Sequence, residues 1–251
     1  MGGSGYEKGL RRFYTPLIDT VRGVATIEGE ELRHLKKVLR LKEGDPLVVL
    51  DGRGRAFRGR VERLSHFSAL IRLGEELEPS TESPLKITLL QALLKGDKNT
   101  LLVQKATELG VSRIVLFTTR RTVREPSVER IGRLKERLER VSIESLKQCG
   151  RTLAPEILIT EFEDALTAGT TSPLKLIFHE RAKTHLKEAL GQPAGAVTVA
   201  VGPEGGFSAE EVALAESKGY RAVGCGPRVL RAETMGMVVV ALVQYALGDM
   251  G

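Results

Sequence analysis

Two loops near the end of the chain, each with a Gly-Pro step, decide its architecture. The first spans residues 201–211 and reads Val-Gly-Pro-Glu-Gly-Gly-Phe-Ser-Ala-Glu-Glu. The second spans residues 224–234 and reads Gly-Cys-Gly-Pro-Arg-Val-Leu-Arg-Ala-Glu-Thr. Each follows a short apolar run and precedes a segment of helical periodicity, which is typical of the strand–loop–helix units of an α/β domain.

Loops of this kind predict a ligand pocket. Open α/β sheets bind ligands at the carboxyl ends of their strands, and glycine lets the backbone approach a ligand closely. The two loops therefore predict one pocket made mostly of backbone, with an arginine and a glutamate at its mouth. The alternative is that Gly202-Pro203 and Gly226-Pro227 are simply tight turns.

Several common site types are absent from the sequence. Neither a G-x-G-x-x-G motif after a strand nor a G-x-x-x-x-G-K-[ST] loop occurs, which argues against dinucleotide and nucleoside-triphosphate sites. The four histidines lie in no nucleophile motif. The two cysteines, Cys149 and Cys225, have no metal-ligand spacing, so we expect no metal and a reducing, cytoplasmic setting.

The pattern around the loops extends the α/β assignment. Short apolar runs predict strands at residues 86–92, 114–118, 174–178, 196–201 and 221–225. Helical periodicity predicts helices at residues 98–109, 129–148, 208–218 and 234–247. Ser208 and Glu211 form a capping box at the start of one of these helices. Runs without alternation suit strands buried on both faces, so we expect a mostly parallel sheet.

The N-terminal part has a different texture. Short alternating runs and the turn signal at residues 51–54 predict a small β-rich unit over residues 11–73, with a helix at residues 30–41. The acidic, proline-containing residues 74–84 are expected to be a linker to a second domain, residues 85–251. Residues 1–10 are expected to be disordered or an addition to the natural chain.

Charge suggests a polyanionic partner. The 251 residues carry a formal charge of +6 and have a pI of about 9.4, a balance that suits nucleic acid without requiring it. The longest apolar stretch, residues 235–243, is about half of what a membrane span needs, so it is expected to be a buried helix and no membrane partner is expected.

Several segments of the sequence resemble one known enzyme family. The segments 202–208 and 226–234 resemble the bacterial 16S ribosomal RNA uracil-N3 methyltransferases, which belong to the trefoil-knotted SPOUT superfamily. Further segments resemble the same family: Arg11–Tyr14, His34–Arg40 with Gly44-Asp45, Gln104–Val111 and Gln148–Arg151. The similarity runs from about residue 11 to the end. One departure is Met235-Gly236-Met237, where small residues such as alanine are expected.

The resemblance implies both a fold and a reaction. It implies a small PUA-like β-barrel that binds RNA, followed by a homodimeric α/β domain with a deep trefoil knot. It also implies transfer of a methyl group from S-adenosylmethionine to N3 of one uridine in the decoding region of 16S ribosomal RNA, within the small ribosomal subunit. Two alternatives stay open: a related ribose 2′-O-methyltransferase, and a non-catalytic RNA-binding ribosome-assembly factor.

The resemblance also implies the residues of the site. The cofactor is expected to lie across three strand ends. Its expected contacts are Phe178, His179, Glu180, Gly202, Pro203, Gly205, Gly206, Phe207, Gly226, Val229, Leu230 and Thr234.

One arginine and one of two glutamates are the candidates for catalysis. Uracil N3 carries a proton, so the reaction needs a base or a group that stabilises the anion. Arg231 is expected to supply positive charge, and Glu233 or Glu204 to accept the proton. The alternative for Glu233 is structural, as an ion-pair partner of Arg231 or an acidic residue at a helix N-terminus.

RNA contact is expected to begin in the N-terminal unit. Residues 11–72 hold 14 Arg and Lys against 8 Asp and Glu, an excess that favours phosphate contact, although a solvated basic face explains it equally well. Tyr14 either stacks on a base or closes the barrel. The expected RNA-binding residues are Arg11, Arg12, Tyr14, Lys36, Lys37, Arg40 and Arg53, with Arg55 and Arg58 as further phosphate contacts.

Overall fold

The computed structural model describes residues 10–78, 81–119, 127–169 and 171–251. The chain divides into two compact units. One comprises residues 1–82 with 143–154, and the other comprises residues 83–142 with 155–251. The expectation for residues 1–10 falls, apart from Leu10, outside the described residues.

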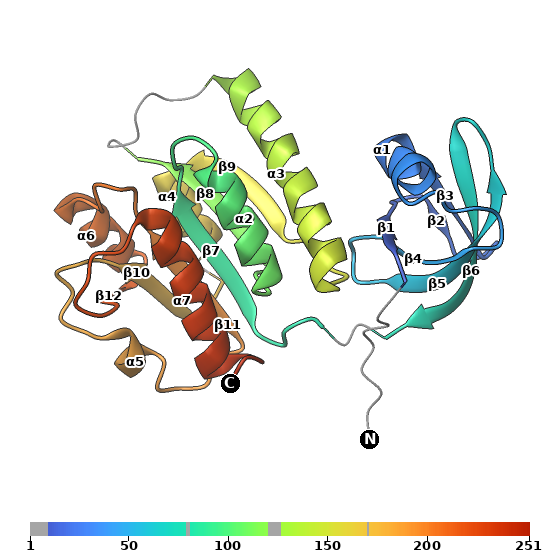
Figure 1. Ribbon diagram of the computed structural model, residues 1–251. Coiled ribbons are helices and arrows are strands. Elements are labelled where there is room, and N and C mark those ends of the chain that lie inside the picture. Colours follow the sequence, from blue (N-terminus) through green and yellow to red (C-terminus); the bar gives the residue numbers. More distant parts are fainter. Residues whose placement is uncertain (1–9, 79–80, 120–126, 170) are drawn as a thin grey trace. The chain divides into compact units, whose positions relative to one another are not determined.

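The first unit is built on a six-stranded mixed sheet with the order β1-β4-β5-β6-β3-β2 (Figure 1). β1 runs parallel to β4, and the other neighbouring strands pair antiparallel. The sheet covers a core that includes Phe13, Leu47 and Ile71. This confirms the expected β-rich unit. Its strands are β1 (Arg12–Tyr14), β2 (Ile18–Asp19), β3 (Val24–Glu28), β4 (Pro46–Leu50), β5 (Ala56–Leu64) and β6 (Ser68–Leu77).

β6 runs into the segment expected to be a linker. Its residues up to Leu77 pair with β5. The acidic side chains there face basic ones across the strands: Glu76 pairs with Arg55 at 2.7 Å, and Glu75 pairs with Arg58 at 3.1 Å. At residues 74–77 the acidic side chains therefore belong to a paired strand, where they form cross-strand ion pairs. Arg55 and Arg58, expected to contact phosphate, are engaged in these pairs.

The helix expected at residues 30–41 is shorter and in two parts. An α-helical turn, α1 (Gly29–Arg33), continues into a π-helical turn, η1 (His34–Val38). Leu32 and Leu35 face the core, as the periodicity predicts. The helix ends before Arg40, whose φ of 54° is left-handed and costs strain for a residue other than glycine.

A buried ion pair attaches residues 143–154 to the first unit. Arg151 is 3% exposed, and its Nε and Nη2 donate to one oxygen of Glu82 at 3.0 and 2.9 Å. The other oxygen of Glu82 accepts from the backbone N–H groups of Thr152 and Leu153. Residues 148–151, one of the segments that carry the resemblance, thus include a structural anchor.

The second unit contains a six-stranded sheet with the order β12-β10-β11-β7-β8-β9. All of its neighbouring strands are parallel, which confirms the expected parallel α/β domain. The trefoil knot that the resemblance implies stays a prediction. The strands are β7 (Lys86–Ala92), β8 (Arg113–Thr118), β9 (Glu156–Glu161), β10 (Leu174–Phe178), β11 (Ala196–Val201) and β12 (Arg221–Val223).

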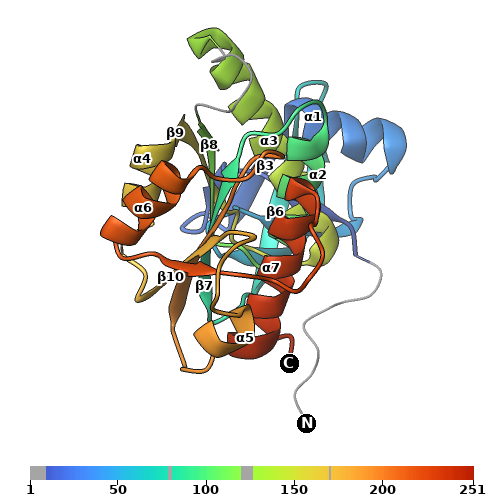
Figure 2. The ribbon, with the colours of Figure 1, turned by 90° about the vertical axis from the view of Figure 1, so that its left-hand side faces the viewer.

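Helices cover both faces of this sheet (Figure 2). One core cluster contains Leu89 of β7 with side chains of α2, α3, α5 and α7, and the other contains the next residue, Leu90, with side chains of α4 and α6. Strands buried on both faces explain the unbroken apolar runs. The helices are α2 (Lys98–Glu108), α3 (Val128–Cys149), α4 (Phe162–Ala168), α5 (Leu186–Ala189), α6 (Ala209–Ser217) and α7 (Ala232–Leu247).

Gly236 allows α7 to pack closely on its neighbours. A Cβ atom placed there would lie 2.5 Å from Oε1 of Gln91 and 2.7 Å from Cδ1 of Leu102. Both are buried, on β7 and α2 respectively. In the Met235-Gly236-Met237 departure, the glycine is therefore the residue that the packing requires.

This packing predicts opposite effects for two glycine substitutions. Gly236→Ala is expected to lower the free energy of unfolding by about 0–2 kcal/mol, because overpacking costs about 1–3 kcal/mol and better helix propensity returns about 1 kcal/mol. Gly132→Ala in α3, where a Cβ meets nothing within 4 Å, is the control and should stabilise by about 0.5–1 kcal/mol. Urea unfolding measures both, and equal shifts would contradict the account.

Candidate active site

The parallel register brings four strand ends to one edge of the sheet. β7, β10, β11 and β12 are neighbours and run in the same direction, so the loops that follow them gather at their carboxyl ends. The loops after β10 and β12 are joined by backbone hydrogen bonds. The Gly224 N–H donates to the Thr184 carbonyl at 2.9 Å, and the Leu186 N–H donates to the Gly224 carbonyl at 3.0 Å. The expected grouping of these loops is therefore present.

The first Gly-Pro loop follows β11 and is anchored by its phenylalanine. Phe207 is 4% exposed and stacks on Phe117, with the ring centroids 6.1 Å apart. A Cβ atom on Gly202 would lie 3.1 Å from the Phe207 ring. Phe207 thus supports the loop from the core, whereas Gly205 and Gly206 are exposed. Pro203 is buried, and its carbonyl accepts from the Gly206 N–H at 2.9 Å.

The second Gly-Pro loop follows β12 and leaves apolar side chains uncovered. Gly226 has a φ of 75°, which favours glycine, and a Cβ there would meet nothing within 4 Å. Val229 is 83% exposed, and Leu230 is half-buried. This arrangement fits the predicted apolar wall. Thr234, in the first turn of α7, is half-buried.

The third predicted wall, residues 178–180 after β10, contains one buried, one half-buried and one exposed residue. Phe178 is buried in the main core cluster, so its side chain serves packing. His179 is half-buried, and its Nδ1 accepts from the Arg181 N–H at 3.4 Å. Glu180 is exposed, 3.9 Å from the Arg181 guanidinium.

Lys98 links the first Gly-Pro loop to the start of α7. Its Nζ lies 3.3 Å from Oε1 of Glu204 and 3.3 Å from Oε1 of Glu233. Lys98 is the first residue of α2, and the turn before it is held by Asn99, whose buried side chain accepts from the Leu94 N–H and donates to the Leu94 carbonyl. The Lys98 ammonium group therefore holds two glutamates, one from the loop after β11 and one from α7.

Glu233 is a buried carboxylate with one oxygen still available. The residue is 8% exposed, and its Oε2 has no hydrogen-bond partner. Burial raises the pKa of this carboxyl, but hydrogen bonds from its own backbone N–H and from Lys98 outweigh burial, so the pKa lies below its ordinary value. Hydrogen bonds to Glu233 and Glu204 in turn raise the pKa of Lys98. The carboxylate is thus held charged, and its buried Oε2 has no hydrogen-bond donor.

Arg231 stands just before α7 as an exposed residue in extended conformation. Of the two structural alternatives for Glu233, the ion pair with Arg231 is replaced by the pair with Lys98. The position in the first turn of α7 is observed, where a carboxylate is stabilised by the helix dipole.

Lys98 was missed by the sequence reasoning, which treats it only as the start of a helix. A usable signal exists: a lysine in the first turn of a helix is unfavourable with the helix dipole, and therefore needs a compensating reason.

The predicted RNA-binding residues lie in the first unit. Arg11, Lys37, Arg40 and Arg53 are exposed, and Arg12 and Lys36 are half-buried. Tyr14 packs partly buried against the cluster of Val48, Leu50 and Leu146, which supports the alternative that it closes the barrel.

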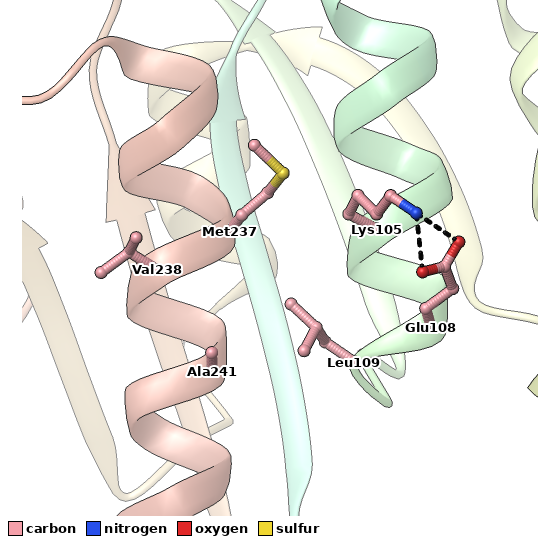
Figure 3. A pocket seen from close by; sticks show the side chains of 6 residues that line it. All are labelled: Lys105, Glu108, Leu109, Met237, Val238 and Ala241. Carbon is pink, nitrogen blue, oxygen red and sulfur yellow. Dashed lines mark hydrogen bonds and ion pairs between the residues drawn. The ribbon is translucent and has the colours of Figure 1, made fainter.

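A separate depression lies between α2 and α7 on the second unit (Figure 3). Figure 3 shows the side chains of Lys105 and Glu108 paired on α2, with apolar side chains of α7 opposite them. Nζ of Lys105 lies 2.9 Å from Oε1 of Glu108. Its lining residues are Lys105, Glu108, Leu109, Met237, Val238 and Ala241. Leu101, Leu242 and Tyr245 on the same two helices are also exposed.

Within the part of the chain that the structure describes, no three His, Cys, Asp or Glu side chains are grouped to hold a metal ion. None of the described helices is long and apolar enough to cross a membrane.

Comparison with known proteins identifies relatives that are all described as RNA methyltransferases. A family described as an RNA methyltransferase domain matches residues 81–244, and a family described as an RNA methyltransferase PUA domain matches residues 27–73. A ribosomal RNA small subunit methyltransferase E from Synechocystis sp. is 31% identical over 234 residues, covering 90% of this chain and 75% of the relative. The protein of the same name from Rickettsia conorii is 32% identical, covering 85% and 86%.

A solved structure agrees with these relatives. The ribosomal RNA small subunit methyltransferase E from Neisseria gonorrhoeae, bound to S-adenosyl methionine, is 31% identical with a TM-score of 0.86. The similarity covers 96% of this chain and 100% of that one.

The Lys98 bridge predicts a pH-dependent change in stability. Glu233, with a lowered pKa, stabilises the fold above its ordinary pKa and loses this contribution as the pH falls. Lys98, with a raised pKa, stabilises below its ordinary pKa and loses this contribution as the pH rises. Lys98→Met should therefore be less stable than the native chain between about pH 5 and pH 10, and the difference should narrow toward pH 3.

Urea unfolding at several pH values measures this difference. Lys95→Met is the matched control, because Lys95 is an exposed lysine on the same turn. A gap between Lys98→Met and the native chain that stays constant with pH would contradict the electrostatic account.

Proposed function

The chain belongs to the RNA methyltransferase family that includes the ribosomal RNA small subunit methyltransferases E, and from this premise we propose that it methylates N3 of one uridine in 16S ribosomal RNA. The proposed substrate is the decoding region within the small ribosomal subunit, and the proposed methyl donor is S-adenosylmethionine. The observation that carries the proposal is the convergence of both Gly-Pro loops with Arg231, Glu233 and Lys98 at one sheet edge.

The residues present fit this donor. Gly226 leaves open space, and Val229 offers an uncovered apolar side chain suited to an adenine ring. The exposed Gly205-Gly206 step carries no side chain that would keep a ligand away from the backbone. When bound, S-adenosylmethionine supplies an electrophilic methyl group on a positively charged sulfur.

Glu233 is proposed to accept the proton of uracil N3. Its Oε2 is the oxygen without a partner, and Lys98 holds Oε1. Oε2 would accept the N3 proton, and the lowered pKa keeps the carboxylate unprotonated at neutral pH. Lys98 acts as a positioning residue, because it fixes which oxygen remains available.

Arg231 is proposed to balance the negative charge that develops on O2, N3 and O4 of the uracil. It is exposed and lies two residues before Glu233, so its guanidinium can reach a substrate without first breaking a buried contact. Electrostatic donors of this kind are worth about 3 kcal/mol each in the transition state.

A homodimer is the proposed assembly. Its support is the apolar surface of α2 and α7, where Leu101, Leu242 and Tyr245 are 43%, 40% and 67% exposed. A cytoplasmic location stays a prediction.

The function is tested by locating the methyl group. Small subunits that lack the modification are incubated with the protein and labelled S-adenosylmethionine, and the nucleosides are separated after digestion. We expect 3-methyluridine. Label on a ribose 2′-oxygen would replace the proposal by the related reaction, and absence of both label and cofactor binding would favour an assembly factor.

Arg231→Ala should lower single-turnover methylation by about 100-fold while leaving S-adenosylmethionine affinity within about twofold. Arg228→Ala is the matched control, because Arg228 is an exposed arginine of the same loop. Equal rates for the two variants would remove Arg231 from the chemistry.

A further inference from the structure

The tip of the β5–β6 hairpin carries an aromatic side chain that the fold does not use. Phe67 is 82% exposed, and the exposed His66 meets its ring edge-on, with the centroids 5.1 Å apart and the planes at 81°. A phenylalanine with this exposure gains little from burial, so its value lies in a contact outside the unit.

The turn that presents Phe67 is well ordered by hydrogen bonds. The Ser65 hydroxyl accepts from the N–H groups of Phe67 and Ser68, at 3.3 and 2.9 Å, and the Ser65 N–H donates to the Ser68 carbonyl at 2.9 Å. The exposed ring is therefore held on a short, internally bonded turn, which lowers the entropy lost when a planar group stacks on it.

One basic residue contacts the turn, and others are close to it or to that residue in sequence. Nζ of Lys36 donates to the Ser65 carbonyl at 3.0 Å and thereby joins the π-helical turn η1 to the hairpin. Lys37 and Arg40 follow in sequence, and Arg63 lies two residues before the turn. Among the described residues, Lys37, Arg40 and Arg63 make no ion pair, so their charges are available. Arg40 in addition holds a left-handed backbone (φ 54°) that glycine would adopt more readily.

We propose that Phe67, with Lys37 and Arg40, binds a single-stranded segment of RNA, in which one base stacks on the Phe67 ring and the basic side chains contact the flanking phosphates. An exposed aromatic ring and unpaired basic side chains on the same unit form the combination that single-stranded nucleic acids require, because every base has a face to stack and every linkage carries a negative charge. The inference rests on the proposed function for its RNA partner and identifies a contact apart from the methylation pocket.

The absence of tryptophan from the chain makes a direct test possible. Phe67→Trp introduces a single fluorescent reporter at the turn, and a 12-nucleotide oligouridylate should quench it in a saturable manner. Val21→Trp, at a position that is 96% exposed on the same unit, is the matched control and should not be quenched. Equal responses at both positions would overturn the proposal.

Affinity for a fluorescein-labelled oligouridylate separates stacking from charge. Phe67→Ala and Phe67→Leu should each weaken binding about tenfold, whereas Phe67→Trp should keep it. Arg40→Gly suits the observed backbone and should leave the fold intact while reducing the salt dependence of binding. These measurements require neither S-adenosylmethionine nor methyl transfer, so they can fail while the proposed function stands. Native affinity in Phe67→Ala, or stronger binding of a matched duplex RNA, would contradict the proposal.

Discussion

The candidate site depends on the all-parallel register of the second sheet. Because β7, β10, β11 and β12 point the same way, their following loops share one edge, and residues more than one hundred positions apart in sequence meet there. Lys98, from the helix after β7, can then contact Glu204 after β11 and Glu233 in the first turn of α7. An antiparallel strand at any of these positions would send one loop to the opposite edge.

The Lys98 bridge also explains how a buried carboxylate is tolerated. Burying an unpaired charge is expensive, and Glu233 has one oxygen compensated by Lys98 and one without a partner. A fold selected only for stability would pair both oxygens or place an apolar residue there. The oxygen without a partner is therefore the observation that agrees with the proposed role of Glu233 as a base.

Much of the second unit could be predicted because its strands read as continuous apolar runs and its helices carry caps such as Ser208 and Glu211, both of which make the predicted hydrogen bonds. β9, α4 and α5 were not predicted: β9 is an edge strand, and α5 has only four residues. The prediction of a linker was wrong at residues 74–77, because these residues continue strand β6. Glu75 and Glu76 form ion pairs with Arg58 and Arg55 on the neighbouring strand β5. Lys98 and Phe67 could not be predicted from the sequence, because their roles depend on the folded structure. Lys98 contacts two glutamates that are distant in sequence, and Phe67 is left exposed by the fold.

The most direct measurement of the central claim is hydrogen–deuterium exchange of the native protein with and without S-adenosylmethionine. We expect the cofactor to slow exchange in the loops after β10, β11 and β12 and in the first turn of α7. Protection confined to the depression between α2 and α7, or no protection at all, would contradict it.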